Sequence, residues 1–485
     1  MNITKKNVVS LAVATALSTP LAVWATNGMN LEAYGPIAGG MGGAAYAYDN
    51  GTAAVMNNPA TLGMMEEGSR LDVAVGSLGP DISSSMASEP KANSSATAFY
   101  MPAVGWVKKS GALAYGVGVF AQGGMGTEYD SNSFLTAGSN ETVRSEVGVG
   151  RFLIPLSYSV NDKFNIAGSI DYVWASMDLK MAMSGAQFAD MLAPAYNGTQ
   201  EYGEVSGSMV DGMMAMVGTA LDPTGPVNWA RFDFSNNSPF LGEAFGSGFA
   251  GKLGFTYKVG SRWTVGASYH SKTALGDMTT GNARVSMNVN MDDGLLAGGT
   301  PTGTYSSVSI PVTGKIRVKD FQWPQTYGIG AAFQATDKIM IAADVKRIGW
   351  ESVMKNFEMS FVADATQDNP LAAGFAGADL DATMYQNWKD QTVIALGAAF
   401  QTTEQLVLRV GYNGSTNPVP DKYLNPLFPA TIKNNFTFGG GYEINKASSV
   451  NASLTYAPEV TATSGEGVTV SHSQINWQVM YSHLF

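Results

Sequence analysis

The chain has 485 residues, a formal net charge of −11 and no cysteine. The missing cysteines exclude disulfides, thiolate nucleophiles and cysteine metal sites, and an acidic chain without a basic stripe argues against a nucleic-acid partner. Charged residues make up only 14 % of the chain and Gly occurs 56 times, whereas about 25 % charged residues is usual in soluble domains. Because no internal run resembles a membrane helix, these values favour one large β structure in an unusual solvent.

Residues 1–25 predict a secretory signal peptide. Lys5 and Lys6 form a basic start, the apolar stretch "VVSLAVATALSTPLAV" follows, and Val23-Trp24-Ala25 places small residues where cleavage occurs. The alternative is a membrane anchor, but Ser, Thr and Pro interrupt a run that is already short. We therefore expect cleavage after Ala25 and export from the cytoplasm.

Residues 26–66 show neither helical nor strand periodicity. Their centre, "GGMGGAAYAYDNGTAAVMNNPATLGM" at 39–64, is rich in Gly, Ala and Asn and carries almost no charge. The segment is too apolar for a solvated linker. We predict that it folds compactly inside the structure formed by the rest of the chain, because glycines allow close approach to a surrounding wall.

From residue 67 to the end, apolar and polar residues alternate with a period of two. The last strand is the clearest example, with Ile475, Trp477, Val479 and Tyr481 on one face. A soluble sandwich alternates in the same way, but here short polar turns alternate with long connections, as in an up-and-down outer-membrane barrel. We predict a 14-stranded antiparallel transmembrane β-barrel over residues 67–485, with strands near 69–79, 97–108, 111–124, 146–160, 163–182, 247–259, 262–291, 308–335, 338–352, 388–402, 405–416, 431–444, 448–460 and 468–485.

One predicted strand, 308–335, is irregular. The apolar residues predicted to face outward first occupy even-numbered positions, Ile310, Val312, Ile316 and Val318. From Tyr327 onward they occupy odd-numbered positions. Such a shift needs an inserted residue, which we place as a bulge around 321–324. A barrel of this width needs a channel or a plug, and 26–66 is the predicted plug.

The plug sequence resembles the N-terminal hatch of the FadL-type outer-membrane transporters of long-chain fatty acids and aromatic hydrocarbons. The matching points are "GMGGAAYAYD", the tripeptide Asn58-Pro59-Ala60, the predicted barrel and the aromatic C-terminus. The resemblance implies capture of an apolar solute in outer loops, binding inside the barrel, and release through a side window at a kink in the third strand. It implies no chemistry, cofactor or metal.

The resemblance also selects candidate residues, each with a structural alternative. Asn58, Pro59 and Ala60 match the hatch motif, and the alternative is an ordinary turn. Met29, Leu31 and Tyr34 lie where the family binds ligand, and the alternative is that they wedge the plug. Gly123 and Gly124 suit the kink, unless the strand simply ends there. The remaining candidates are apolar residues of the outer loops, which otherwise pack on themselves, and inward cations, which otherwise form lumenal salt bridges: Phe188, Met191, Leu192, Met213, Met214, Arg151, Arg317 and Arg409.

The predicted function is uptake of hydrophobic compounds across the bacterial outer membrane, with long-chain fatty acids as the first substrate class. The alternatives are aromatic hydrocarbon uptake, a general diffusion porin, or a surface adhesion or receptor barrel. An enzyme is not expected, because His270, His472 and His483 lie on separate strands without metal spacing or a nucleophile elbow. Expected partners are apolar small molecules, outer-membrane lipid and lipopolysaccharide, and the assembly machinery that reads the terminal Phe485. The expected oligomeric state is a monomer.

Overall fold

The structure is a computed structural model that describes residues 27–238 and 241–485. The predicted signal peptide, residues 1–25, lies outside the described residues. The described strands form a single sheet in which every pairing between named strands is antiparallel. None of the described helices is both long and apolar enough to cross a bilayer.

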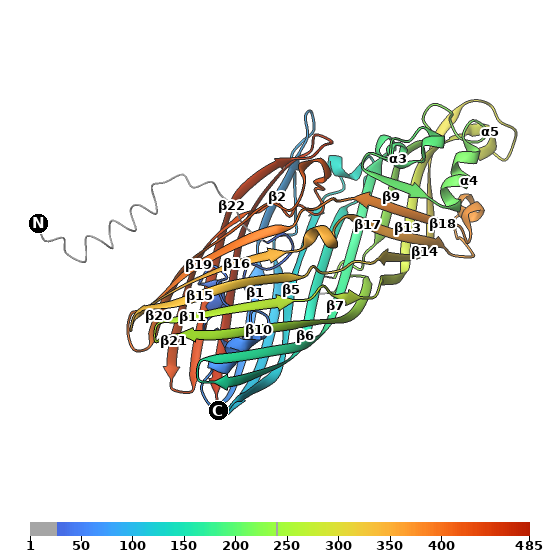
Figure 1. Ribbon diagram of the computed structural model, residues 1–485. Helices are drawn as coiled ribbons and strands as arrows, with labels where there is room; N and C mark the ends of the chain where they lie inside the picture. The colour runs from blue at the N-terminus through green and yellow to red at the C-terminus, as the bar shows by residue number, and fades with distance from the viewer. Residues whose placement is uncertain (1–26, 239–240) are drawn as a thin grey trace, which may run out of the picture.

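The sheet closes on itself as an elongated barrel (Figure 1). Its first strand, β1, pairs on one side with the second wall strand, β4, and on the other with the C-terminal strand, β23. The closed circuit runs through β1 (Gly68–Leu78), β4 (Phe99–Ser110), β5 (Leu113–Tyr129), β6 (Val143–Asn161), β7 (Phe164–Ser184), β9 (Val227–Phe234), β13 (Met278–Asp292), β10 (Ala244–Val259), β11 (Trp263–His270), β15 (Thr326–Thr336), β16 (Ile339–Ile348), β19 (Gln391–Gln401), β20 (Leu406–Ser415), β21 (Asn434–Asn445), β22 (Ser448–Thr463) and β23 (Thr469–Leu484).

The predicted count of fourteen strands is therefore wrong, because this circuit contains sixteen strands among the described residues. The two missed strands are β9, which lies in a predicted loop, and β13, which was merged with β11. β9 pairs with the outer end of β7 and with β13, and β13 meets β10 at Thr279 and Phe245. Toward the end of the barrel where the C-terminus lies, β7 and β10 pair directly from Met177 and Ala244 to Phe164 and Tyr257. The two added strands thus widen the barrel only at its outer end.

Seven of the strands in the described residues lie outside the circuit. Four of them, β14, β17, β18 and β8, extend the sheet from β13 beyond the wall, at the end of the molecule farthest from the C-terminus (Figure 1). The seven are β2 (Pro80–Ser85), β3 (Ala92–Asn93), β8 (Gly203–Ser206), β12 (Ala274–Leu275), β14 (Tyr305–Lys319), β17 (Asn356–Ala363) and β18 (Asp379–Tyr385). The helices of the same end are α3 (Gly185–Met191), α4 (Ser208–Met216) and α5 (Asp293–Leu296), and short 3₁₀ turns in the connections are η3 (Phe134–Thr136), η4 (Pro194–Tyr196), η5 (Trp350–Ser352), η6 (Pro370–Phe375) and η7 (Asp421–Tyr423).

This outer extension reverses the facing that alternation predicted for β14. Ile316 and Val318 are buried in an apolar core, whereas Arg317 between them is exposed. The reason is that a sheet standing in water must turn its apolar face inward. The predicted bulge at 321–324 is also wrong. The chain leaves the sheet between β14 and β15, and Trp323 is fully buried there, with its backbone oxygen accepting from Thr273 N at 3.1 Å.

Around the wall, the outward side chains are large and apolar. Ile154, Ile170, Leu253 and Ile329 are each more than half exposed, on a closed sheet whose strands satisfy one another's backbone groups. Both properties are required of a structure that spans lipid.

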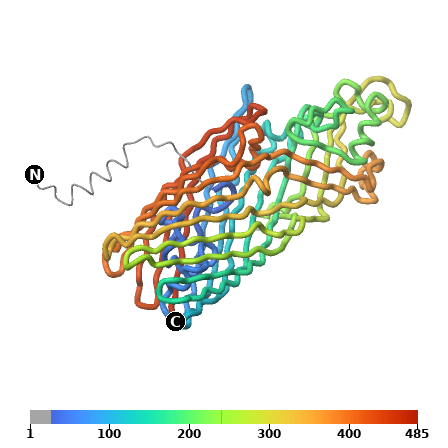
Figure 2. Tube along the Cα trace, in the orientation of Figure 1, coloured from blue at the N-terminus to red at the C-terminus, as the bar shows by residue number. Residues whose placement is uncertain are grey.

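The described residues before β1, from residue 27 onward, lie inside the barrel, as the blue trace in Figures 1 and 2 shows. They contain α2 (Pro36–Gly39) and the 3₁₀ helices η1 (Gly51–Val55) and η2 (Pro59–Met64). Gly42, at φ +67°, approaches the backbone of β19 and β20 so closely that a Cβ would collide with Tyr412 and Leu396. We call the described part of this segment, residues 27–66, the hatch.

Candidate functional site

The hatch motif is an anchor to the wall. The Asn58 side chain is fully buried and caps η2 by accepting from Ala60 N at 3.1 Å, while Pro59 supplies the first residue of the turn. Its Nδ2 donates to Tyr46 O at 2.8 Å within the hatch and to Phe255 O of β10 at 3.1 Å. One side chain therefore joins two parts of the hatch to the barrel.

The third wall strand, β5, is kinked. Its pairing with β6 shifts between Ala121 and Gly123, so Gln122 is an extra residue in the strand. On its other side, the described pairing of β5 with β4 ends at Val119 and Val104, although β4 stays paired with β1 from Phe99 to Lys109. The outer part of β5 has thus separated from β4.

The hatch takes the place of β4 beside the kink. Gly124 N donates to Met29 O at 3.0 Å, Leu31 N donates to Gln122 O at 3.4 Å, and Tyr34 Oη donates to the same oxygen at 2.9 Å. The five predicted residues of the inner site and the kink, Met29, Leu31, Tyr34, Gly123 and Gly124, therefore meet at one place. A Cβ on Gly123 would collide with Met29 O and lie 2.9 Å from a ring carbon of Trp323, so this approach needs glycine.

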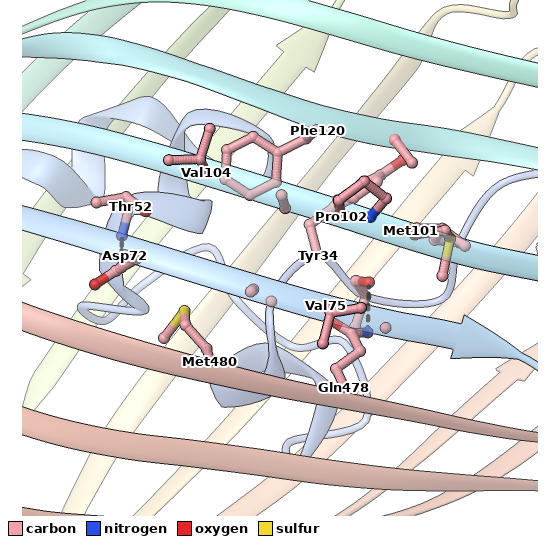
Figure 3. A pocket seen from close by; sticks show the side chains of 17 residues that line it. Tyr34, Thr52, Asp72, Val75, Met101, Pro102, Val104, Phe120, Gln478 and Met480 are labelled. Atoms are coloured by element: carbon pink, nitrogen blue, oxygen red, sulfur yellow. Dashed lines mark hydrogen bonds between the residues drawn. The ribbon is translucent and has the colours of Figure 1, made fainter. Parts of the chain in front are cut away.

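A pocket lies in the wall where β5 leaves β4, and we call it the side window (Figure 3). Its lining combines hatch residues such as Tyr34 with Pro102 and Val104 of β4 and Phe120 of β5. Val104 is 41 % exposed on the outward face. A second pocket continues along the same gap, between Met29 of the hatch and Phe99 of β4. The two pockets adjoin at Leu31, which lines both.

A buried charged cluster lies behind the kink. Arg151 Nη1 is 2.7 Å from Asp171 Oδ2, and Lys252 Nζ donates to the same oxygen. The side chains of Arg151, Asp171 and Lys252 are all fully buried, and Arg151 Nε donates to Gln122 Oε1. With two cations and one anion, the cluster depends on neutral acceptors such as Gln122.

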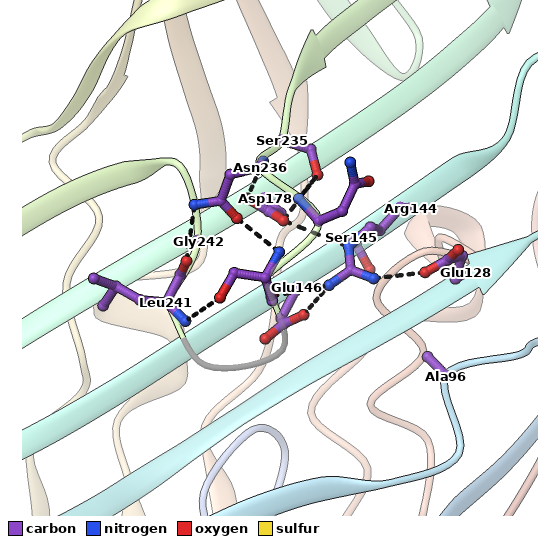
Figure 4. A network of polar contacts seen from close by, with 12 residues as sticks. Ala96, Glu128, Arg144, Ser145, Glu146, Asp178, Ser235, Asn236, Leu241 and Gly242 are labelled. Carbon is purple, nitrogen blue, oxygen red and sulfur yellow. Dashed lines mark hydrogen bonds and ion pairs between the residues drawn. The ribbon is translucent and has the colours of Figure 1, made fainter.

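The outer end of β5 is fixed on its other side by a polar network (Figure 4). Arg144 of β6 bonds to Glu128 of β5 at 2.5 Å and also to Glu146, and its Nε lies 3.5 Å from Asp178 of β7. Asp178 in turn accepts from Glu243 N at 2.7 Å, just before β10. The separation of β5 from β4 therefore lies between the start of β5, which pairs with β4, and its outer end, which the Arg144 network holds.

A small apolar pocket lies in the lumen beyond Met29. Its walls are methionines and aromatic rings from several strands, and its free volume is about 20 Å³. Trp388 lines it and forms an edge-to-face pair with Trp350, which does the same with Trp323, at centroid distances of 5.2 and 5.6 Å. No charged side chain lines this pocket within the described residues. The lining residues are Met29, Val147, Met177, Met181, Phe321, Met354, Phe357, Met384, Gln386, Trp388, Asn425 and Phe428.

A much larger cavity, about 610 Å³, opens among the outer loops. We call it the outer groove. Met181 lines both it and the lumenal pocket, so the two adjoin. At its polar end, Lys422 is 3.0 Å from Glu201 and lies 5.5 Å from the ring centroids of Tyr202 and Tyr423. These side chains come from loops far apart in sequence, and nothing local in the sequence marked them.

The remaining candidate residues are dispersed. Met191 lines the outer groove, whereas Phe188 and Leu192 are buried beside it in the apolar core. Met213 is buried in that core and Met214 packs against it, away from the groove. Arg317 faces outward, 3.6 Å from Asp277. Arg409 lines a separate cavity beside Ile37 and Tyr48 of the hatch and donates to Asn451 Oδ1 at 3.0 Å. Of the predicted inward cations in this set, only Arg151 lies beside the side window.

Comparisons with known proteins agree with this geometry. A sequence model of the family described as "Outer membrane protein transport protein (OMPP1/FadL/TodX)" matches residues 22–482. The toluene transporter TodX of Pseudomonas putida is 29 % identical, with a TM-score of 0.77 over 94 % of this chain and 99 % of that one. The toluene transporter TbuX of Ralstonia pickettii is 27 % identical, with a TM-score of 0.72 over 94 % and 99 %.

Two further relatives are informative in a narrower way. A FadL homologue of Pseudomonas aeruginosa, 14 % identical with a TM-score of 0.66 over 94 % of this chain and 100 % of that one, shares the fold. An uncharacterised Chlorobium limicola protein from the 5′ region of a phosphoenolpyruvate carboxykinase gene is 59 % identical over 61 residues, 12 % of this chain and only 30 % of that relative. The family match spans nearly the whole chain, and the chain therefore belongs to the OMPP1/FadL/TodX family of transport channels for hydrophobic solutes in the bacterial outer membrane.

Proposed function

We propose that this barrel takes up small apolar solutes, with monoaromatic hydrocarbons as the main class. The observation that carries the proposal is the lumenal pocket, whose lining of methionines and aromatic rings lacks a charged group among the described residues. Methionine side chains shift readily to admit flat apolar molecules, and a ring the size of toluene needs the least displacement in so small a space. The transporters TodX and TbuX, named for toluene, support the same class.

The proposed route has three steps. A solute enters the outer groove, passes the shared wall at Met181 into the lumenal pocket, and leaves beside Met29 through the side window into the membrane. Lateral exit avoids returning apolar surface to water, which costs about 0.8 kcal/mol for each exposed CH₂ group. In this proposal the protein catalyses no reaction and needs no cofactor, and residues 26–66 serve as the hatch of a barrel formed by residues 67–485. We further propose that the barrel is a monomer, surrounded by lipid and lipopolysaccharide and inserted by the assembly machinery.

A second substrate class, long-chain fatty acids, has one observation in its favour. Arg151 Nη2 is buried and has no hydrogen-bond partner in the described part of the chain. A guanidinium N–H in such a place suits a carboxylate. Binding of a fatty-acid carboxylate would therefore use Arg151, whereas binding of an aromatic hydrocarbon would not.

Uptake measurements separate these possibilities. The host cells lack their own channel and carry this gene. We expect them to take up radiolabelled toluene at low concentration, and we expect the gene to increase oleate uptake only slightly. If aromatic hydrocarbons are the substrates, Arg151→Met should leave the ratio of toluene uptake to oleate uptake unchanged. A loss of oleate uptake in Arg151→Met that exceeds the loss of toluene uptake would instead establish the fatty-acid class. A large steady bilayer conductance with no uptake of either solute would refute the proposal and indicate a porin.

Asn58→Ala tests the hatch as a barrier. The substitution removes the cap of η2 and the bonds to Tyr46 O and Phe255 O, and the loss of such buried bonds costs about 1–3 kcal/mol for each unsatisfied group. We expect normal insertion but a leak of small polar solutes, measured as bilayer conductance and sensitivity to a polar antibiotic. Asn161→Ala, which removes an exposed turn residue, is the matched control. A variant that is as impermeable to small polar solutes as wild type would show that Asn58 is not needed for the barrier.

A further inference from the structure

The bulge residue of β5, Gln122, is the point where the window, the hatch and the charged cluster meet. Its backbone oxygen accepts from Leu31 N and from Tyr34 Oη of the hatch. Its side-chain oxygen accepts from Arg151 Nε. Gln122 is 3 % exposed, so all of these contacts are made away from bulk water.

The unpaired edge of β4 offers little to hold β5 in a regular sheet. Pro102 lies on β4 opposite the departing part of β5 and has no N–H to donate. A separated strand edge nevertheless leaves polar backbone groups that must be satisfied. In β5 the hatch satisfies them, and this requires the kink to stay at a fixed depth in the lumen.

The depth of the kink is set by the charged cluster. Asp171 accepts from Arg151 Nη1 at 2.7 Å and is itself bonded by Lys252 and, at 2.7 Å, by Ser169 Oγ, so the Arg151 side chain is tied to two neighbouring strands. Arg151 Nε therefore presents a fixed, buried donor to β5. A strand that straightened toward β4 would withdraw Gln122 Oε1 and leave this charged donor without its acceptor, which is costly in a dry site.

We propose that Gln122 is the positioning residue that keeps the side window open, by bonding the kink of β5 to Arg151 and through it to Asp171 and Lys252. The inference rests on the proposed lateral route, because it assigns the element that controls the exit. Gln122 need not contact the solute. It acts by keeping β5 bent toward the hatch and away from β4.

The experiment measures the width of the window directly. The chain has no cysteine, so Pro102→Cys and Ala121→Cys introduce a unique pair for spin labels on the two sides of the window. The distance between the labels is measured by dipolar electron paramagnetic resonance in purified, lipid-embedded barrel. In parallel, toluene uptake is measured with the unlabelled variants.

Gln122→Met keeps the length of the side chain but removes the acceptor, and Gln122→Glu keeps an acceptor for Arg151. We expect Gln122→Met to shorten the label distance and to lower toluene uptake about tenfold, which corresponds to about 1.4 kcal/mol, whereas Gln122→Glu restores both. Combining Gln122→Met with Arg151→Met should shorten the distance no further than either change alone. Gln391→Met, which removes a buried glutamine from β19, is the control for general loosening and should leave the label distance unchanged.

The outcomes distinguish this inference from the function on which it rests. An unchanged label distance in a folded Gln122→Met barrel, judged by its heat-modifiable gel mobility, would overturn the positioning role. A shortened distance with unchanged toluene uptake would support the positioning role and refute the lateral route.

Discussion

Replacing Gly123 with valine is expected to reduce toluene uptake by about tenfold or more, equivalent to roughly 1.4 kcal/mol or more. Even a Cβ at this position would collide with Met29 O and crowd Trp323. The hatch and the kinked strand then cannot both keep their positions, and the window closes or loses its inner wall. Initial uptake rates at low solute concentration measure the effect.

Gly148→Val is the matched control for this prediction. Gly148 is the direct partner of Gly124 on β6, and a Cβ there would meet nothing within 4 Å. We expect this variant to transport as wild type does. Equal rates for the two valine variants would show that the contact between Gly123 and the hatch is not needed for transport.

Asp171→Asn is expected to destabilise the barrel by about 3–5 kcal/mol, the usual cost of removing one partner from a buried ion pair. The change leaves Arg151 and Lys252 as two buried cations without a counter-charge. The urea concentration at which the folded barrel loses its compact gel mobility measures the loss. The control is Asp162→Asn in an exposed turn, which should have little effect.

The double variant Asp171→Asn with Lys252→Met gives this prediction its sharper form. Removing Lys252 along with the anion removes the repulsion between the two buried cations, so the double variant should be more stable than Asp171→Asn alone. A double variant that is less stable, with an additive loss, would contradict the role of charge balance in the cluster.

The sequence predicted the membrane-facing wall well because lipid imposes a strict rule on it. Each outward position between two inward ones must be apolar, so Ile475, Trp477 and Val479 were identified by alternation alone, and all three are exposed on the wall. The same rule gave the wrong answer for Ile316 and Val318, because β14 stands above the membrane, where water reverses which face is apolar. It also missed β9, since a short strand at the outer end carries the same apolar residues as a packed loop, and it merged β13 with β11, because only residues 271–277 separate the two strands.

The candidate site was predictable in part for a related reason. Gly123, Gly124 and Asn58 were selected through the family resemblance. The two glycines allow a close approach that a Cβ would block, and Asn58 supplies a capping side chain. Gln122 and Lys422 went unrecognised, because their partners lie on strands or loops far away in the chain. Met213 and Met214 were chosen for composition, and the core rather than the outer groove contains or contacts them. Composition identifies apolar side chains, but it does not show whether they line a ligand cavity or pack in the core.

The most direct test of lateral release is transport by a barrel whose window is closed by a disulfide between Pro102→Cys and Ala121→Cys. A disulfide between Lys108→Cys and Tyr115→Cys, a directly opposed pair on the same two strands, controls for cross-linking where β4 and β5 already pair. We predict that oxidation stops toluene uptake in the first barrel only, and that a reducing agent restores it. Full uptake by the oxidised first barrel would contradict release through the wall.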